Sequence, residues 1–316
     1  MSTPRDAGQP HRYRAFGLAI ESSFPLTELE SDAREGPADV VIRRGAVALP
    51  PGDHTDRLQL TGAGAVLNVS EAARYLIRDG REIVVQQYAV GSDRHMRLFL
   101  LGSAMGVVLH QRGILPLHAN VMVLGQGAAA FMGASGAGKS TMAAWFHDRG
   151  YPVLSDDVCA VTTAEDGRVL AQPGIPRLRL WRDALEATGR DAAAHEHAFD
   201  DADKYNVRTA VAAGEEPQPL DAIYLLDTTR DAERDFSVTR LSGLDAIEAL
   251  IANTYRGGYL PILGGQQRHL AACARVANAT AIYRVSRRWG REHFAEQMQQ
   301  LEIHAAQHGV EAMAPR

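Results

Sequence analysis

A glycine-rich segment that ends in lysine and serine is the feature that most constrains how this chain can fold. Residues Gly133–Ser140 satisfy the pattern G-x-x-x-x-G-K-[ST]. An apolar stretch ending at Phe131 and Met132 precedes the segment, and a helix-forming stretch follows it through Phe146. The sequence therefore predicts a buried strand, a tight loop and a helix in succession, which is typical of an α/β sheet.

The residue types of this loop predict a site for the phosphates of a nucleotide. Its glycines let the backbone curl until successive N–H groups point inward at a helix N-terminus, which attracts anions. Lys139 is expected to neutralise the β- and γ-phosphates, and the Ser140 hydroxyl to bind Mg²⁺. The predicted nucleotide-binding residues are Gly133, Ala134, Ser135, Gly136, Ala137, Gly138, Lys139, Ser140 and Thr141. A strand-to-helix turn that binds no ligand is the alternative.

Two adjacent carboxylates follow the loop at short range. Asp156 lies 17 residues after Lys139 (156 − 139) and is followed directly by Asp157. One helix and one turn fit in this interval, so the next strand can bring both side chains beside the phosphates. One carboxylate could then hold the metal while the other accepts the proton of an attacking hydroxyl. A helix N-cap or an acidic surface turn is the alternative.

His118 and Lys204 are the remaining candidates. His118 begins the strand pair that leads into the loop, where it could hydrogen-bond a carboxylate and tune its basicity. A buried histidine with an ordinary partner is the alternative. Lys204, in the polar segment Asp203–Arg208, is expected to stabilise the transferring phosphoryl group or to hold an acidic end of the substrate. A solvated lysine fits the sequence equally well.

Three segments, Leu117–Val121, Gly133–Ser140 and Tyr151–Asp157, together resemble the catalytic core of the HPr kinase/phosphorylase family. In that family a histidine, a phosphate loop and an Asp-Asp pair occur in this order with this spacing. The resemblance implies the α/β P-loop kinase core shared with phosphoenolpyruvate carboxykinase-like kinases. The roles it implies are proton acceptor for Asp156, partner of that acceptor for His118, and Mg²⁺ ligation for Ser140 and Asp157.

Two departures from that family narrow the expected activity. Thr141 stands where HPr kinases usually carry an acidic residue. The segment Gly174–Asp183 is arginine-rich and offers only Asp183 where the family has a metal-binding glutamate. These differences argue against a phosphorylase activity and against HPr as the substrate. The layout of the whole chain looks more like the HPr-kinase-like proteins of lasso peptide pathways, some of which phosphorylate a serine at the C-terminus of a precursor peptide.

Other classes of nucleotide-binding protein fit less well. No N-K-x-D motif occurs, which argues against a GTPase. Leu263–Arg268 resembles the signature loop of transporter-type ATPases, but it lacks the signature serine. The later segment Ala281–Arg288 also has no acidic residue, which that class requires after the signature.

Composition excludes several further classes. The 316 residues carry 33 Lys and Arg against 38 Asp and Glu, a formal net charge of −5 that argues against nucleic-acid binding. Cys159 and Cys273 each stand alone, which argues against a disulfide framework or a cysteine-rich zinc site. Met1–Arg14 lacks the apolar core of a secretory signal, and no run approaches the roughly 18 apolar residues of a membrane span. The sequence therefore predicts a cytoplasmic protein outside the membrane.

A change of pattern along the chain predicts two domains. Residues 1–93 contain short β-rich segments and form the first, with substrate recognition as the expected role. Residues 94–316 form the kinase domain, which opens with a buried helix over Arg94–Gln111. Strands are expected at Arg12–Glu21, Ala38–Arg43, Glu82–Tyr88, Val121–Leu124, Ala128–Met132, around Val153, Val158–Val161, Ala222–Leu226 and Ala281–Val285, and further helices at Asp245–Tyr255, Gln267–Val276 and Arg291–Gln307.

These observations predict an ATP- and Mg²⁺-dependent kinase that phosphorylates a serine hydroxyl of a peptide or small protein, with a lasso precursor peptide as one acceptor. A small-molecule hydroxyl kinase and a nucleotide-binding regulator without transfer are the alternatives. The sequence identifies neither the acceptor nor the oligomeric state, and it is compatible with a homo-oligomer.

Overall fold

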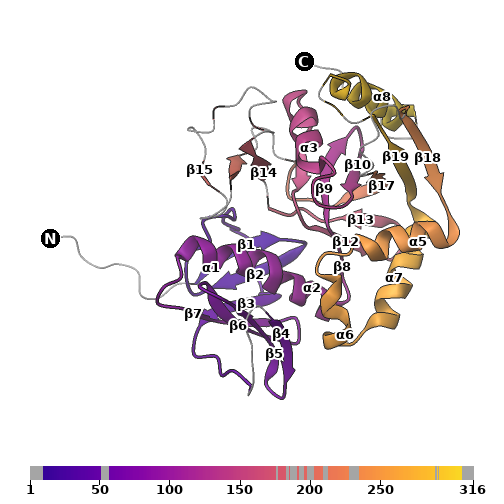
Figure 1. The fold of residues 1–316 in the computed structure, drawn as a ribbon. Helices are drawn as coiled ribbons and strands as arrows, with labels where there is room; N and C mark the ends of the chain where they lie inside the picture. Colours follow the sequence, from indigo (N-terminus) through magenta and orange to yellow (C-terminus); the bar gives the residue numbers. More distant parts are fainter. Residues whose placement is uncertain are drawn as a thin grey trace. The chain divides into compact units, whose positions relative to one another are not determined.

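The structure is a computed structural model that describes residues 10–50, 57–175, 177–182, 185, 191, 196–197, 203–208, 213–227, 235–288, 290 and 292–307. It is a mixed α/β structure with two compact units, whose elements are labelled in Figure 1. The first unit contains Met1–Gly113 and Gly258–Gly265, and the second contains Ile114–Gly257 and Gln266–Arg316.

The first unit is built on a seven-stranded sheet with the order β1-β2-β3-β7-β6-β5-β4. Its strands are β1 (His11–Ala15), β2 (Leu18–Ser22), β3 (Val40–Arg44), β4 (Arg57–Thr61), β5 (Gly64–Val69), β6 (Ala73–Arg78) and β7 (Glu82–Gln87). The predicted β-rich segment Arg12–Glu21 is a hairpin, because Phe16 and Gly17 have φ of 59° and 75° and reverse the chain. Two successive positive φ values suit the twist of an antiparallel pair.

The predicted helix over Arg94–Gln111 is confirmed, and it packs within the first unit. It consists of α1 (Asp93–Phe99), the π-helical turn η1 (Leu100–Ala104) and α2 (Met105–Arg112), and it ends at Gly113 with φ of 73°. The Tyr75 hydroxyl of β6 donates a hydrogen bond of 2.7 Å to the buried Met96 carbonyl. The chain therefore divides after Gly113 and not after residue 93. The short α6 (Leu260–Leu263) belongs to the same unit, and η3 (Gly257–Tyr259) leads into it.

The second unit contains a larger mixed sheet with the order β11-β9-β10-β17-β13-β12-β8, extended by β19 on β17 and by β18 on β19. Its strands are β8 (Leu115–Leu117), β9 (Ala119–Leu124), β10 (Gly127–Met132), β11 (Val153–Ser155), β12 (Cys159–Thr163), β13 (Val169–Ala171), β17 (Gln218–Leu226), β18 (Ser237–Leu241) and β19 (Ala281–Ser286). A small sheet has the order β14 (Arg177–Trp181), β16 (Lys204–Arg208), β15 (Glu196–His197).

Helices cover both faces of the larger sheet, as Figure 1 shows. Ala129 and Phe131 of β10 pack with α3 (Lys139–Asp148) and α8 (Phe294–Gln307). Ala128 and Ala130 pack with α5 (Gly243–Ala252) and α7 (Gln266–Ala279) on the opposite face. Side chains alternate along a strand, so a strand buried on both faces is apolar throughout, as β10 is. The predicted helices here are confirmed with shifted ends.

Three parallel strands end at the same edge of this sheet, and the segments that follow them meet there. β10 pairs with β17, and β17 pairs with β19, in parallel. Ligands of such sheets bind beyond the carboxyl ends of the strands. The segment Gly133–Gly138 follows β10, Asp227 follows β17, and Arg287 follows β19. This edge is where the candidate site lies.

Candidate active site

The glycine-rich loop (Gly133–Gly138) joins β10 to α3 through conformations that favour glycine. Gly133, Gly136 and Gly138 have φ of 151°, 80° and 89°. A Cβ on Gly133 would lie 2.9 Å from the carbonyl oxygen of Leu226 in the neighbouring β17, so a side chain has no room there. At Gly136 a Cβ would meet nothing within 4 Å, and the loop is exposed to solvent from Ala134 to Gly136.

Lys139 is the first residue of α3 and is only 8% exposed. Its ammonium group donates hydrogen bonds to the carbonyl oxygens of Gly133 (2.7 Å) and Ala134 (3.2 Å). These bonds offset part of the cost of burying the charge. Ser140 and Thr141 follow, half-buried, in the first helical turn. A helix N-terminus, an ammonium group and exposed loop backbone in one place fit the polyphosphate of a nucleotide.

The acidic pair lies in the turn between β11 and β12. Asp157 has φ of 72°, and its N–H donates a 3.4 Å hydrogen bond to Oδ1 of Asn120, at the start of the neighbouring β9. A non-glycine residue in this conformation stores strain on the order of 1 kcal/mol, which is typical of functional sites. Asp156 is 8% exposed, and its Oδ2 accepts the N–H of Arg179 over 2.8 Å.

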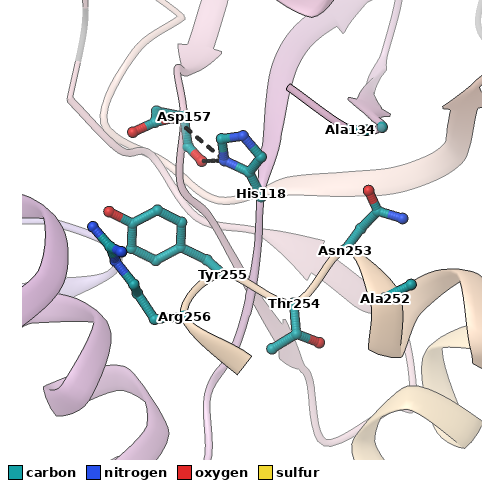
Figure 2. Close-up of a pocket in the computed structure, with 9 residues that line it drawn as sticks. His118, Ala134, Asp157, Ala252, Asn253, Thr254, Tyr255 and Arg256 are labelled. Carbon is teal, nitrogen blue, oxygen red and sulfur yellow. Dashed lines mark hydrogen bonds and ion pairs between the residues drawn. The ribbon is translucent and has the colours of Figure 1, made fainter. Parts of the chain in front are cut away.

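His118 lies against Asp157. Its Nδ1 is 3.3 Å from Oδ1 of Asp157 and 3.1 Å from the Asp157 carbonyl oxygen, as the dashed lines in Figure 2 show. Both partners are acceptors, which assigns a proton to Nδ1 and, in the neutral ring, an acceptor lone pair to Nε2. On its other side Asp157 meets Arg179, whose Nη1 is 3.3 Å from Oδ2. One carboxylate is therefore held between a histidine and an arginine.

The segment after α5 reaches this pair through backbone hydrogen bonds. The His118 N–H donates to the Asn253 carbonyl over 2.7 Å, and the Tyr255 N–H donates to the Pro116 carbonyl over 2.8 Å. The Tyr255 ring lies 6.0 Å from that of His118. Burial, and then the negative charge of Asp157, raise the pKa of Tyr255 to about 12, so the phenol is protonated at neutral pH.

These elements enclose a pocket with a volume of about 400 Å³. It is lined by His118, Gly133, Ala134, Asp157, Ala252, Asn253, Thr254, Tyr255 and Arg256, most of which Figure 2 labels. The pocket therefore joins the start of the glycine-rich loop, the His118–Asp157 contact and a wall of polar groups. A volume of this size suits a small molecule or a short part of a peptide.

The predicted site residues lie in the second unit, but only some of them line the pocket. Asp157, His118, Gly133 and Ala134 line it, and Lys139 bonds to its wall, whereas Asp156 is buried and bonds to β14. The backbone of Lys204 lies in β16, but its side chain lies outside the described residues, as does Asp183.

Sequence reasoning missed three residues at this edge: Tyr255, Asp227 and Arg287. The sequence did contain a signal for Asp227, because this acidic residue directly follows the apolar run Ala222–Leu226. No sequence pattern marks Tyr255, which reaches the pocket only because its segment bonds to Pro116.

Among the residues that the structure describes, no group of three or more His, Cys, Asp and Glu side chains is arranged to hold a metal ion. Kinases hold Mg²⁺ largely through one or two carboxylates and the substrate phosphates, so Ser140 and Asp157 stay the predicted ligands. Within the same described ranges, no helix is long and apolar enough to cross a membrane.

Replacing Gly174 with alanine is expected to disturb the acidic turn. A Cβ there would lie 2.2 Å from Oγ of Ser155, the residue before Asp156. The Gly174 N–H is also bonded to the Leu154 carbonyl over 2.9 Å, so the backbone cannot move away freely. We expect a loss of about 1–3 kcal/mol in the free energy of unfolding, measured by urea denaturation.

The control for this substitution is Gly62→Ala, because a Cβ at Gly62 would meet nothing within 4 Å. Its unfolding free energy should change by less than about 0.5 kcal/mol. Equal stability of the two variants would contradict the close packing of Gly174 on Ser155.

Comparison with known proteins assigns this chain to no family. No protein-family model matches this chain, and no curated protein sequence matches it. Similar solved structures include the Hpr(Ser) kinase/phosphatase from Coxiella burnetii, at 11% sequence identity and a TM-score of 0.32. That match covers 61% of this chain and 99% of the other.

Proposed function

We propose that this chain is an ATP- and Mg²⁺-dependent kinase that transfers the γ-phosphoryl group to a hydroxyl. The observation that carries the proposal is a single pocket lined both by the glycine-rich loop, at Gly133 and Ala134, and by Asp157 with its partner His118. Phosphate loops occur in many nucleotide-binding proteins, but attack by a hydroxyl also requires a proton acceptor beside the γ-phosphate. A regulator that only binds a nucleotide has no need of one.

Nucleotide binding falls to the loop and the first turn of α3. The loop amides, with Ser140 and Thr141, would hold the phosphates, and Lys139 would exchange its bonds to the loop carbonyls for the β- and γ-phosphate oxygens. ATP supplies the phosphoryl group that is transferred. Ser140 and Asp157 would hold the Mg²⁺ ion. Lys204 remains a proposed contact for the phosphoryl group or an acidic end of the acceptor.

The two carboxylates would divide two tasks, proton acceptance and metal binding. Following the resemblance to HPr kinases, we assign proton acceptance to Asp156 and metal binding to Asp157. His118, through its contact with Asp157, would keep that carboxylate oriented. The position of Asp157 in the pocket favours the reverse assignment as the second candidate. The two assignments predict that different variants, Asp156→Asn or Asp157→Asn, regain activity when the Mg²⁺ concentration is raised.

The acceptor proposed is a serine of a peptide or small protein, with a lasso precursor peptide as the specific candidate. This choice rests on the resemblance of the motifs. The pocket wall is compatible with a peptide, because Asn253, Tyr255 and Arg256 offer an amide, a phenol and a guanidinium for its polar groups. The nearest rival is a small-molecule hydroxyl compound, which a pocket of about 400 Å³ also accommodates.

The acceptor proposal is tested with peptides encoded beside this gene. The purified protein is incubated with each peptide, with [γ-³²P]ATP and Mg²⁺, and with a panel of small hydroxyl compounds in parallel. We expect a phosphate-sized mass gain on a serine of one peptide. Phosphorylation of small hydroxyl compounds alone would replace the peptide with the small-molecule acceptor, and ATP binding without any transfer would favour the regulator.

A further inference from the structure

Arg287 lies directly after β19 and against the glycine-rich loop. It is 6% exposed, and its Nη2 donates a 2.7 Å hydrogen bond to the Ala137 carbonyl oxygen. A Cβ on Gly138 would lie 2.6 Å from the same nitrogen atom. Arginine is rarely buried this deeply in proteins. The guanidinium therefore lies against the last peptide units of the loop, immediately before Lys139.

The hydrogen bond to Ala137 fixes the direction of the next N–H group. A trans peptide is planar, and its C=O and N–H bonds point in opposite directions. Because the Ala137 carbonyl points at Arg287, the Gly138 N–H is turned to the opposite side of the loop. Gly138 has φ of 89°, in the left-handed region that glycine adopts readily. Because glycine lacks a Cβ, sterics alone restrict the orientation of this peptide less than they would at another residue. The hydrogen bond from Arg287 therefore limits rotation of the Ala137–Gly138 peptide unit.

Arg287 also adds charge to the same place. Burial lowers the pKa of its guanidinium, but arginine stays protonated at neutral pH. Lys139 contacts the beginning of the loop, at Gly133 and Ala134, while Arg287 contacts its end, at Ala137. A charged donor also polarises the peptide it binds, which strengthens the N–H on the other side as a donor. Two cations at the two ends of one loop favour an anion with more than one charge.

We propose that Arg287 is a positioning residue for nucleotide phosphates, which holds the Ala137–Gly138 peptide with its N–H toward the phosphates. This inference rests on the proposed function only in so far as the loop binds phosphate. It does not depend on transfer to an acceptor. Arg287 acts through the loop, in contrast to Lys139, whose ammonium group would contact the phosphates itself.

Calorimetric titration of Arg287→Gln with ATP, with inorganic tripolyphosphate and with adenosine tests the proposal. We expect the affinity for ATP and tripolyphosphate to fall about tenfold or more, as for loss of a charged hydrogen bond, with no change for adenosine. The KM for ATP should rise in parallel, while kcat at saturating ATP stays within about threefold. The matched control is Arg288→Gln, which removes the same charge from the adjacent, more exposed side chain that pairs with Asp235. It should bind all three probes like the unaltered protein.

Equal binding of tripolyphosphate by Arg287→Gln and Arg288→Gln would overturn the proposal. A fall in kcat without a change in ATP affinity would also overturn it, because that result places the effect of Arg287 in the transfer step and not in phosphate binding. If Arg287→Gln does not fold, Arg287→Lys replaces it. Lysine keeps the charge but not the planar fork, so phosphate affinity should still fall severalfold, and unchanged affinity would overturn the proposal. Failure of the kinase proposal looks different, because the unaltered protein would then bind tripolyphosphate but transfer no phosphate.

Discussion

Asp156→Asn should abolish phosphate transfer while ATP still binds. Asparagine keeps the shape of the side chain and can still accept the 2.8 Å hydrogen bond from the Arg179 N–H. It cannot take a proton from the attacking hydroxyl, and loss of a general base typically costs a factor of about 10²–10⁴ in rate. We expect kcat to fall in this range at every Mg²⁺ concentration, with the Kd for ATP within about threefold of the unaltered protein. Transfer from [γ-³²P]ATP and calorimetric titration measure the two quantities.

Asp157→Asn is the matched comparison, because the two residues are adjacent and the change is identical. As a metal ligand, Asp157 should be replaceable in part by a higher concentration of the metal. We therefore expect the variant to regain activity as Mg²⁺ is raised, whereas Asp156→Asn does not. The opposite pattern would exchange the two roles, and full activity of both variants would remove the acidic pair from the reaction.

Lys139→Met should remove both ATP binding and transfer. Methionine preserves much of the apolar stem but deletes the ammonium group, which bonds to the Gly133 and Ala134 carbonyls and would bind the phosphates. Charged hydrogen bonds are worth about 1.5–3 kcal/mol each, so two lost phosphate contacts predict a fall of about a hundredfold or more in ATP affinity.

Fluorescence or calorimetric titration with ATP measures this loss. Lys139→Arg keeps the charge and serves as the control for charge alone, while circular dichroism confirms that each variant is folded. Adenosine, which has no phosphate, should bind to the lysine variants as it does to the unaltered protein. ATP binding by Lys139→Met at unaltered affinity would show that the loop is not the phosphate site.

The local backbone structure of the candidate site could be predicted from the sequence. The strand β10, the loop and α3 follow one another directly, so three glycines, a lysine and an apolar strand suffice to predict them. The interval from Lys139 to Asp156 is also short, and one helix and one strand connect the two. The resemblance of the motifs added roles for these residues. Sequence reasoning expected His118 to hydrogen-bond a carboxylate, and the structure shows that its partner is Asp157.

The parts that sequence reasoning missed depend on contacts between distant segments. Tyr255 reaches His118 through a hydrogen bond to Pro116, more than a hundred residues earlier in the chain. Arg287 meets Ala137 because β17 lies between β10 and β19 and pairs with both in parallel, an order that no single segment encodes. The boundary at residue 93 was misplaced for a similar reason. The sequence of a buried apolar helix does not say which sheet it packs on, and only contacts such as that between Tyr75 and Met96 assign it to the first unit.

A crystal structure with a non-hydrolysable ATP analogue and Mg²⁺ tests the central claim most directly. The account predicts that the analogue's β-phosphate accepts hydrogen bonds from the loop amides and from Lys139, with its γ-phosphate in the pocket that Asp157 and His118 line. Ser140 and Asp157 should be the protein ligands of the metal. An analogue bound away from Gly133–Ser140, or a γ-phosphate directed away from the acidic pair, would contradict the account.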